Sequence, residues 1–145
     1  MDRLAFARGN RCACGNIRRA ARSVTQYYDS YLKPSGIRST QLSVLLSISL
    51  NDGITINELA ELLVMDQTTV TRNVGILEER GYVISVAAVN DGRKRHLAVT
   101  DKGTEKLEEV MPLWDAAQSR LEADLGPERF RDMLKLVNQL IVLTK

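Results

Sequence analysis

The stretch of residues 55–103 constrains the fold more than any other part of the chain, because its local signals follow one another in a fixed order. Thr55-Ile-Asn-Glu58 has the spacing of a capping box, in which a hydroxyl and a carboxylate together satisfy the first turn of a helix. Met65 interrupts that helix, and Asp66 is a residue type that caps a new one. We therefore predict two short helices joined by a tight turn, the second over residues 67–80.

A β-hairpin is predicted directly after this helix pair. Gly81 is expected to end the second helix as a C-cap. Residues 82–89 are rich in β-forming types, and Asn90-Asp91-Gly92 is the strongest short turn signal in the chain. Residues 96–99 provide the return strand. A single hairpin is marginal in water, so it is expected to lean on the helices as a wing.

The N-terminal part of the chain has helical periodicity. Apolar residues recur at three- and four-residue steps from about Asn10 to Leu32, where Lys33-Pro-Ser-Gly36 supplies breakers. A second helix is expected to begin at Ser39 or Thr40, because both residue types are good N-caps.

The C-terminal part is also predicted to be helical. Thr100 is expected to cap a helix over residues 101–125, which Pro112 should kink rather than end. Pro127 suits the first position of a last helix. That helix is apolar on more than one face, which a single chain does not need and which therefore indicates a partner helix.

Together these signals predict a mainly α fold with a two-stranded β wing. We expect one domain over residues 1–145, with a winged helix-turn-helix lobe over 39–103 and helical dimerisation segments over 9–35 and 104–145. The hydrophobic content of 44% is high enough for a core and argues against disorder.

The start of the second short helix has the composition of a DNA-reading surface. In helix-turn-helix proteins these residues meet base edges in the major groove. No carboxylate that would repel phosphate lies between Gln67 and Gly75. The alternative is an ordinary polar helix face. The candidate contacts carry hydroxyl, amide or guanidinium groups: Gln67, Thr68, Thr69, Thr71, Arg72 and Asn73.

The hairpin tip is a second candidate contact with DNA. Arg93, Lys94 and Arg95 are consecutive cations, which suits a probe of phosphates or of the minor groove. Asp91 is expected to hydrogen-bond the Arg93 guanidinium and fix its direction. The alternative is a solubilising turn whose cations protect an edge strand.

Charge and cysteine content limit the remaining classes. The net charge of +2 is unevenly distributed, with a basic segment over residues 1–38 and an acidic one over 104–126. Two cysteines are too few for a disulfide-stapled secreted scaffold, and no signal peptide or bilayer-spanning run is visible. A cytoplasmic protein without membrane contact is expected.

Cys12 and Cys14 leave three interpretations open. They are small apolar residues of the structure, or redox sensors activated by neighbouring arginines, or metal ligands. On a regular helix they point away from each other, so pairing needs a frayed terminus or a partner chain. The only histidine, His96, is far away in sequence, and no metal site or cofactor is expected. Motifs for a thiol oxidoreductase or another enzyme are lacking.

The chain resembles the MarR family of bacterial transcriptional regulators over nearly its full length. The resemblance rests on residues 57–63, 68–74 and 77–83, on Asp91-Gly-Arg-Lys-Arg95, and on the Leu-x-Val-Thr-x-x-Gly pattern of residues 97–103. It implies a sequence-specific DNA-binding homodimer on a pseudo-palindromic operator. It also implies repression relieved by a small molecule or by oxidation. The runner-up is a winged-helix module that binds only proteins.

The same resemblance places an effector pocket between the dimer helices and the DNA-binding lobe. Arg22, Tyr28 and Trp114 are the candidates to line it, with Arg22 pairing an acidic group of a small aromatic or acidic ligand. The alternative is that the aromatic residues belong to the core.

Overall fold

The computed structural model describes residues 8–145 and confirms a mainly α fold with one hairpin. Residues 1–7, the start of the expected single domain, lie outside the described residues. Within the described part, no helix is both long and apolar enough to cross a membrane. Short 3-10 turns occur at Arg8–Arg11 (η1) and Lys33–Ser35 (η2). The main elements are α2 (Ala13–Leu32), α3 (Ser39–Leu50), α4 (Ile56–Leu63), α5 (Gln67–Glu79), β1 (Val83–Ala88), β2 (Asp91–Val99), α6 (Asp101–Leu125) and α7 (Pro127–Thr144).

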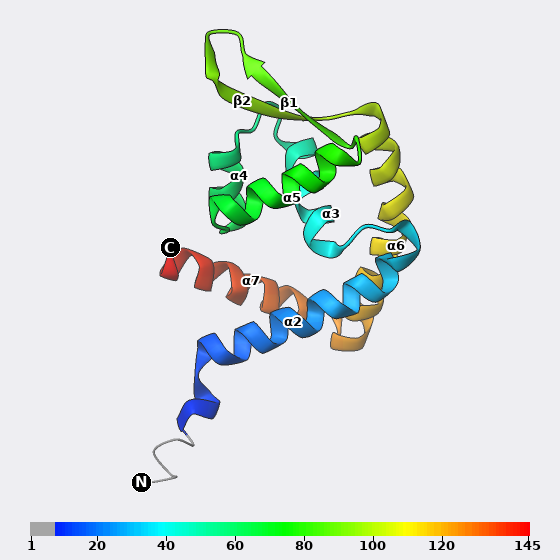
Figure 1. Ribbon diagram of the computed structural model, residues 1–145. Helices are drawn as coiled ribbons and strands as arrows, with labels where there is room; N and C mark the ends of the chain where they lie inside the picture. The colour runs from blue at the N-terminus through cyan, green and yellow to red at the C-terminus, as the bar shows by residue number, and fades with distance from the viewer. Residues whose placement is uncertain (1–7) are drawn as a thin grey trace.

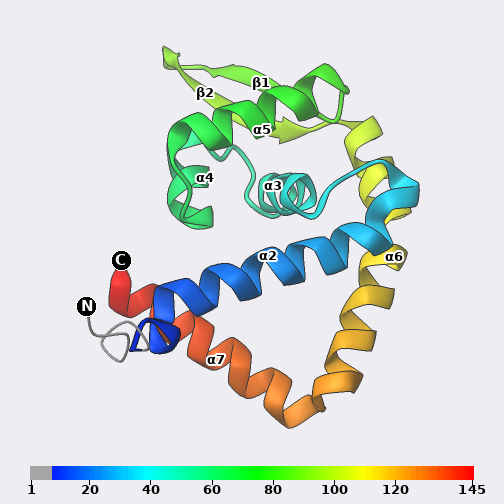
Figure 2. The same cartoon turned by 60° about the horizontal axis from the view of Figure 1, so that its bottom comes forward.

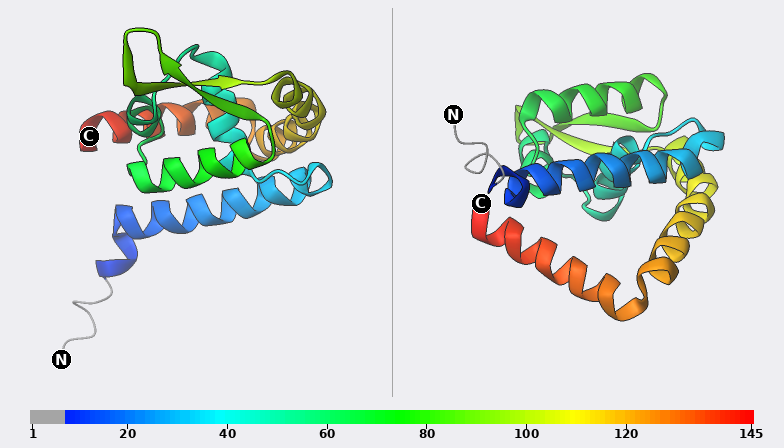
Figure 3. Two further views of the ribbon diagram at one scale, coloured as in Figure 1. Left: turned by 45° about the horizontal axis from the view of Figure 1, so that its top comes forward. Right: turned by 90° about the horizontal axis from the view of Figure 1, so that it is seen from below.

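The elements form a lobe and a helical frame. α3, α4, α5 and the hairpin form the lobe, and α2 and α7 lie on the side of it that is opposite to the hairpin (Figure 1). α6 leads away from the lobe into α7 (Figure 2). Seen from below, α2, α6 and α7 form three sides of a triangle (Figure 3). α6 is continuous through Pro112, so this proline does not end the helix, as predicted.

The core lies where the lobe helices meet the hairpin and α6. Its members come from every element of the lobe, which is why the helix pair and the wing hold a fixed relation to each other. Each such buried side chain contributes on the order of 1.5–3 kcal/mol through removal of apolar surface from water. The fully buried side chains include Leu45, Leu59, Val70, Leu77, Leu97 and Val110.

The helix caps predicted in the lobe are confirmed. Thr55 Oγ1 accepts from the Glu58 backbone N–H, and Glu58 Oε2 accepts from the Thr55 backbone N–H at 2.8 Å. Asp66 Oδ1 accepts from the Thr69 N–H at 2.8 Å and caps α5. Thr100 caps α6 by accepting from the Gly103 N–H.

The start of α3 differs from the prediction that Ser39 or Thr40 is its N-cap. Arg38 is the N-cap residue, and its backbone N–H donates to Oε1 of Gln41. The Ser39 N–H donates to the Asp29 carboxylate on α2 at 2.7 Å. The start of α3 is therefore satisfied in part by Asp29, ten residues away, and no local pattern predicts that contact.

The hairpin turn also differs from the prediction. The turn residues are Val89 and Asn90, and β2 begins at Asp91 rather than near residue 96. Ala88 pairs with Asp91, whereas Ala87 pairs with Arg95. Residues 92–94 therefore lie between two pairs without a counterpart on β1. This is a bulge, which bends the strand and redirects its side chains.

Candidate nucleic-acid interface

The first turns of α5 present a polar, exposed surface. Asp66 caps this helix at the point where the chain leaves the tight turn after α4. Val70 and Val74 point inward and are buried, as predicted. The exposed face therefore carries only uncharged polar groups and one cation, from four of the predicted residues: Gln67, Thr68, Thr71 and Arg72.

The other two predicted residues of α5 bond within the protein. Thr69 is half-buried, and its hydroxyl donates to Asp66 Oδ2 at 2.7 Å. Asn73 is also half-buried and donates from Nδ2 to the Thr69 carbonyl oxygen at 2.9 Å. The side-chain and backbone hydrogen bonds from Thr69 lower the pKa of Asp66. Thr69 and Asn73 thus stabilise the helix start, and their side chains are not free in the way the sequence suggested.

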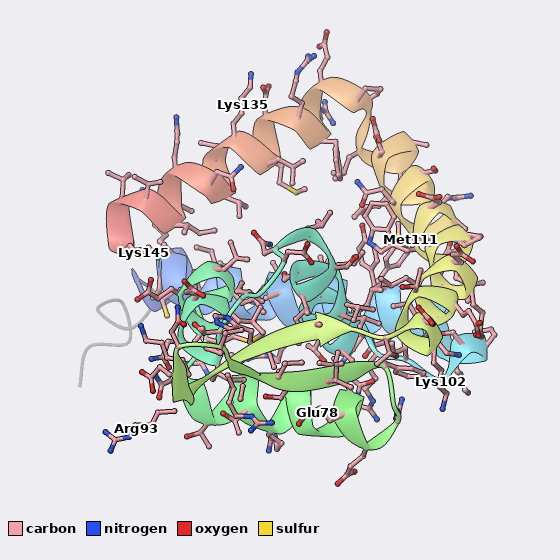
Figure 4. The ribbon with its side chains drawn as sticks, turned by 90° about the horizontal axis from the view of Figure 1, so that it is seen from above. Glu78, Arg93, Lys102, Met111, Lys135 and Lys145 are labelled. Atoms are coloured by element: carbon pink, nitrogen blue, oxygen red, sulfur yellow. The ribbon has the colours of Figure 1, made fainter. Side chains whose placement is uncertain are left out.

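The wing carries its cations on the bulged part of β2. Arg93, Lys94 and Arg95 are all exposed. Figure 4 shows the Arg93 side chain extending away from the body of the protein. Arg95 bends back instead, donating from Nε to Ser85 Oγ and from Nη2 to the Ser85 carbonyl oxygen, both at 2.7 Å. Arg93 therefore projects from the wing, and Lys94 is exposed beside it.

The expected bond from Asp91 to the Arg93 guanidinium is wrong. Asp91 Oδ1 accepts from the Arg93 backbone N–H at 3.0 Å. A short aspartate side chain reaches the backbone two residues on more easily than the end of a long arginine. Asp91 thus shapes the turn and leaves the guanidinium of Arg93 free.

Two contacts fix the base of the wing against the turn between α3 and α4. The Leu97 N–H donates to the Ile54 carbonyl oxygen at 2.9 Å. Nδ1 of His96 lies 2.5 Å from the Gly53 carbonyl oxygen, which assigns the ring proton to Nδ1 because a carbonyl only accepts. These bonds set the direction in which β2 leaves the lobe.

Asn57 is a polar residue of this surface that no sequence pattern indicated. It is exposed on α4, and its Oδ1 accepts from Nε2 of Gln67. It also lines a hollow between α4 and the wing, together with Glu58 and residues 93–96. Bonds from Thr55 lower the pKa of Glu58, with smaller contributions from His96 and Lys94. Because Asn57 and Gln67 are ten residues apart and on different helices, no local pattern joins them.

Comparison with known proteins places this arrangement in one family. The MarR family model matches residues 35–94. The chain is 34% identical over 119 residues to the transcriptional repressor MprA of Escherichia coli, covering 75% of this chain and 67% of MprA. It is 37% identical to the Mycobacterium tuberculosis transcriptional regulator MosR in a crystal structure with DNA, covering 92% of this chain and 99% of MosR with a TM-score of 0.78. The chain belongs to the MarR family of transcriptional regulators.

The fold of this MarR-family chain recurs at lower identity. The Staphylococcus aureus MepR structure in complex with DNA has a TM-score of 0.78 at 20% identity and covers 90% of this chain. The match to the family model runs from the end of η2 into β2, so it covers the helix pair and the bulge. The frame helices α2, α6 and α7 are included in the similarity to MosR.

The effector residues expected from the family are only partly brought together. Tyr28 and Trp114 line a hollow between α2, α3 and α6, whereas Arg22 is exposed on α2 and is not among the lining residues. Tyr28 also donates a hydrogen bond to Oε1 of Gln118. The other lining residues, which the sequence did not point to, are Val24, Thr25, Ser39, Thr40, Leu42, Ser43, Leu46 and Met65.

Both cysteines of this MarR-family chain are exposed free thiols. Cys12 is the N-cap residue of α2 and has an extended backbone, whereas Cys14 lies in the first turn of the helix. The two residues therefore do not both sit on a regular helix. Among residues 8–145, no group of three or more His, Cys, Asp or Glu side chains is arranged to hold a metal ion.

Proposed function

We propose that this MarR-family regulator is a homodimeric repressor that binds a pseudo-palindromic DNA operator. The observation that carries the proposal is that one lobe presents two features: a helix face over residues 67–75 without a carboxylate, and exposed cations at the bulge of β2. The start of α5 enters the major groove, and Arg93 and Lys94 contact phosphates or the minor groove beside it. Gln67, Thr68, Thr71 and Arg72 are the residues that meet base edges or backbone.

Electrostatics supports this assignment. Each cation that neutralises a phosphate releases a condensed counterion, so affinity falls as salt rises. The contacts of His96 and Leu97 at the base of the wing fix the backbone of β2 against the lobe, so less backbone entropy is lost on binding. The relatives MosR and MepR have been solved in complex with DNA, and MprA is named a repressor.

Exposed apolar residues on α7 support a dimer. Phe130 is the one buried residue of α7 in the single chain. A contiguous apolar surface of this kind is rare on monomers and is typical of an interface with another copy. The large exposed side chains are Met133, Leu134, Leu136, Val137, Leu140, Ile141, Val142 and Leu143.

The release signal has two candidate sites. The first is a small aromatic or acidic ligand in the hollow lined by Tyr28 and Trp114, whose aromatic and apolar lining favours an aromatic group. Alternatively, oxidation of Cys12 and Cys14 changes the start of α2, since both thiols are accessible. The protein works in the cytoplasm as a binding protein without catalytic activity or cofactor.

DNA binding is tested by selecting duplexes from a random library and measuring their affinity across a salt series. Arg93→Ala should weaken binding and reduce the slope of log affinity against log salt by about one. Glu78→Ala, near the C-terminal end of α5 and away from residues 67–72 (Figure 4), should leave this slope nearly unchanged. Finding no salt-dependent enrichment of any duplex, together with a protein partner that binds the lobe, would establish the protein-interaction alternative.

Titrating the protein–DNA complex with an oxidant or with a small ligand distinguishes the two candidate release signals. Added oxidant should release DNA from the wild type but not from the Cys12→Ser/Cys14→Ser variant if the thiols are the sensor. If the hollow lined by Trp114 is the sensor site, Trp114 fluorescence should change when small aromatic acids such as benzoate are added. Release in the serine variant by oxidant would contradict the thiol mechanism.

A further inference from the structure

Asn57 and Gln67 form a side-chain pair that bridges the two helices of the helix-turn-helix. Asn57 lies in the first turn of α4, and Gln67 is the first residue of α5. Nε2 of Gln67 donates to Oδ1 of Asn57 at 2.5 Å. Both residues are exposed, and both line the hollow beside the turn that joins the two helices. The pair is thus located at the leading edge of the proposed DNA-reading surface.

We infer that Asn57 is a positioning residue that makes Gln67 select adenine over guanine in the operator. The inference rests on the proposed function, since it describes how one residue of the DNA-reading helix is aimed. A glutamine carboxamide carries two N–H donors and one carbonyl acceptor. The bond to Asn57 uses one of the donors. One N–H and one carbonyl oxygen remain for a base.

This remaining set matches one purine and not the other. In the major groove adenine offers N7 as an acceptor and its N6 amino group as a donor, whereas guanine offers the two acceptors N7 and O6. A free glutamine can place both of its N–H groups on guanine. With one N–H held by Asn57, the Gln67 oxygen would face guanine O6 without a proton between them. By holding one N–H of Gln67, Asn57 thus disfavours guanine as well as favouring adenine.

The bond is not needed to hold the two helices together. The turn between them already has its own backbone bonds, from Val64 N–H to Glu61 O and from Met65 N–H to Ala60 O. Leu59 and Val70 pack the two helices in the core and are completely buried. An exposed bond between two amides contributes little more to stability. Its main consequence is that it fixes a flexible side chain before DNA arrives.

The test compares base preference, position by position, for matched variants. The selected operator is prepared with A·T or G·C at each position, and affinities are measured by fluorescence anisotropy. Wild type should favour A·T by roughly tenfold or more at one position of each half-site, which Gln67→Ala identifies by losing that preference. Asn57→Ala should lower this ratio at least about threefold at the same position only. The Asn57→Ala/Gln67→Ala double variant should equal Gln67→Ala.

Two further variants separate positioning from a structural effect. Asn57→Asp keeps the acceptor oxygen, so it should retain the base ratio while its charge weakens binding to every duplex alike. Asn51→Ala removes an exposed amide that donates to the Ser47 carbonyl oxygen, away from α5, and should change neither quantity. Melting temperature is recorded for each variant to show that it is folded.

The outcomes distinguish failure of this inference from failure of the proposed function. An unchanged adenine-to-guanine ratio in Asn57→Ala, or a loss spread over all positions, overturns the role of Asn57 while DNA binding stands. A Gln67→Ala variant that loses no positional preference does the same. If wild type itself shows no selective, salt-dependent binding, the proposed function fails and the inference fails with it.

Discussion

Nη1 of Arg80, at the C-terminal end of α5, donates to the carbonyl oxygen of Gly36, 3.0 Å away and 44 residues earlier in the chain. Nζ of Lys106 on α6 donates to the neighbouring Ser35 carbonyl oxygen at 3.2 Å. The turn between α2 and α3 is therefore tied to the end of α5 and to α6. These two bonds join the frame to the lobe.

Arg80→Ala should loosen this connection at a small cost in stability. Because Arg80 is exposed, the lost hydrogen bond is worth only about 0.5–1 kcal/mol, measured by urea unfolding. Hydrogen exchange at the N–H groups near Gly36 should become faster. Arg129→Ala, an exposed arginine on α7, is the matched control and should leave that exchange unchanged. Equal exchange rates in both variants would show that the Arg80 bond does not hold the turn.

Gly103 occupies a position where a larger residue does not fit. A Cβ there would lie 2.1 Å from the Tyr82 carbonyl oxygen and 2.7 Å from Cγ1 of Val99. Gly103→Ala should therefore cost about 3 kcal/mol or more in the free energy of unfolding. A Cβ at Gly75 would have no atom within 4 Å. Because Gly75 lies inside a helix, Gly75→Ala should raise the free energy of unfolding by up to about 1 kcal/mol. A loss of less than about 1 kcal/mol in the free energy of unfolding for Gly103→Ala would contradict the close packing of α6 against Tyr82 and Val99.

Val64 has a left-handed backbone with φ of 53°, which is unfavourable for a β-branched residue. Val64→Gly should relieve about 1–2 kcal/mol of strain, offset in part by the backbone entropy of glycine, and so raise the melting temperature slightly. The Val64 side chain is 59% exposed, so little burial is lost. Val89→Gly, at a fully exposed residue of the hairpin turn, should give no such gain. A lower melting temperature for Val64→Gly would contradict this account.

Asp66 makes the stability of the start of α5 depend on pH. Hydrogen bonds from Thr69 lower its pKa below the ordinary value of 3.8. A group with a depressed native pKa stabilises the protein above its unfolded pKa, and this contribution is lost as pH falls through the native value. Asp66→Ala should therefore lower the urea midpoint at pH 7, and the difference from wild type should shrink below about pH 4. A difference that stays constant down to pH 2 would rule out the charged cap.

The apolar surface of α7 predicts the response of the dimer to charge. Leu136 and Leu140 lie one turn apart and are 61% and 38% exposed in the single chain. The Leu136→Glu/Leu140→Glu variant should sediment as a monomer in analytical ultracentrifugation, because burying two carboxylates in an apolar interface is strongly unfavourable. Leu50→Glu, at a 79% exposed leucine of the lobe, should remain dimeric. Dimers in both variants would place the interface elsewhere.

Features encoded over three or four residues could be predicted from the sequence. The caps at Thr55, Asp66 and Thr100 were predicted correctly, because each depends only on residues within its own first helical turn. The bond from Ser39 to Asp29 at the start of α3 and the pairing of Asn57 with Gln67 were missed, because each joins residues ten positions apart. The bond from Arg38 to Gln41 is local, but arginine is not a residue type that is expected at an N-cap. The hairpin turn was predicted at residues 90–92 but lies at residues 89–90, because β2 contains a bulge that the local turn pattern does not reveal.

Hydroxyl-radical footprinting of the protein on a selected duplex tests the central claim most directly. A homodimer with α5 in the major groove should protect two segments related by a dyad, their centres separated by about 34 Å or a multiple of it. Arg93→Ala should restore cleavage at the flanking positions where the wing contacts DNA. A single asymmetric protected segment, or a footprint unchanged in Arg93→Ala, would contradict the account.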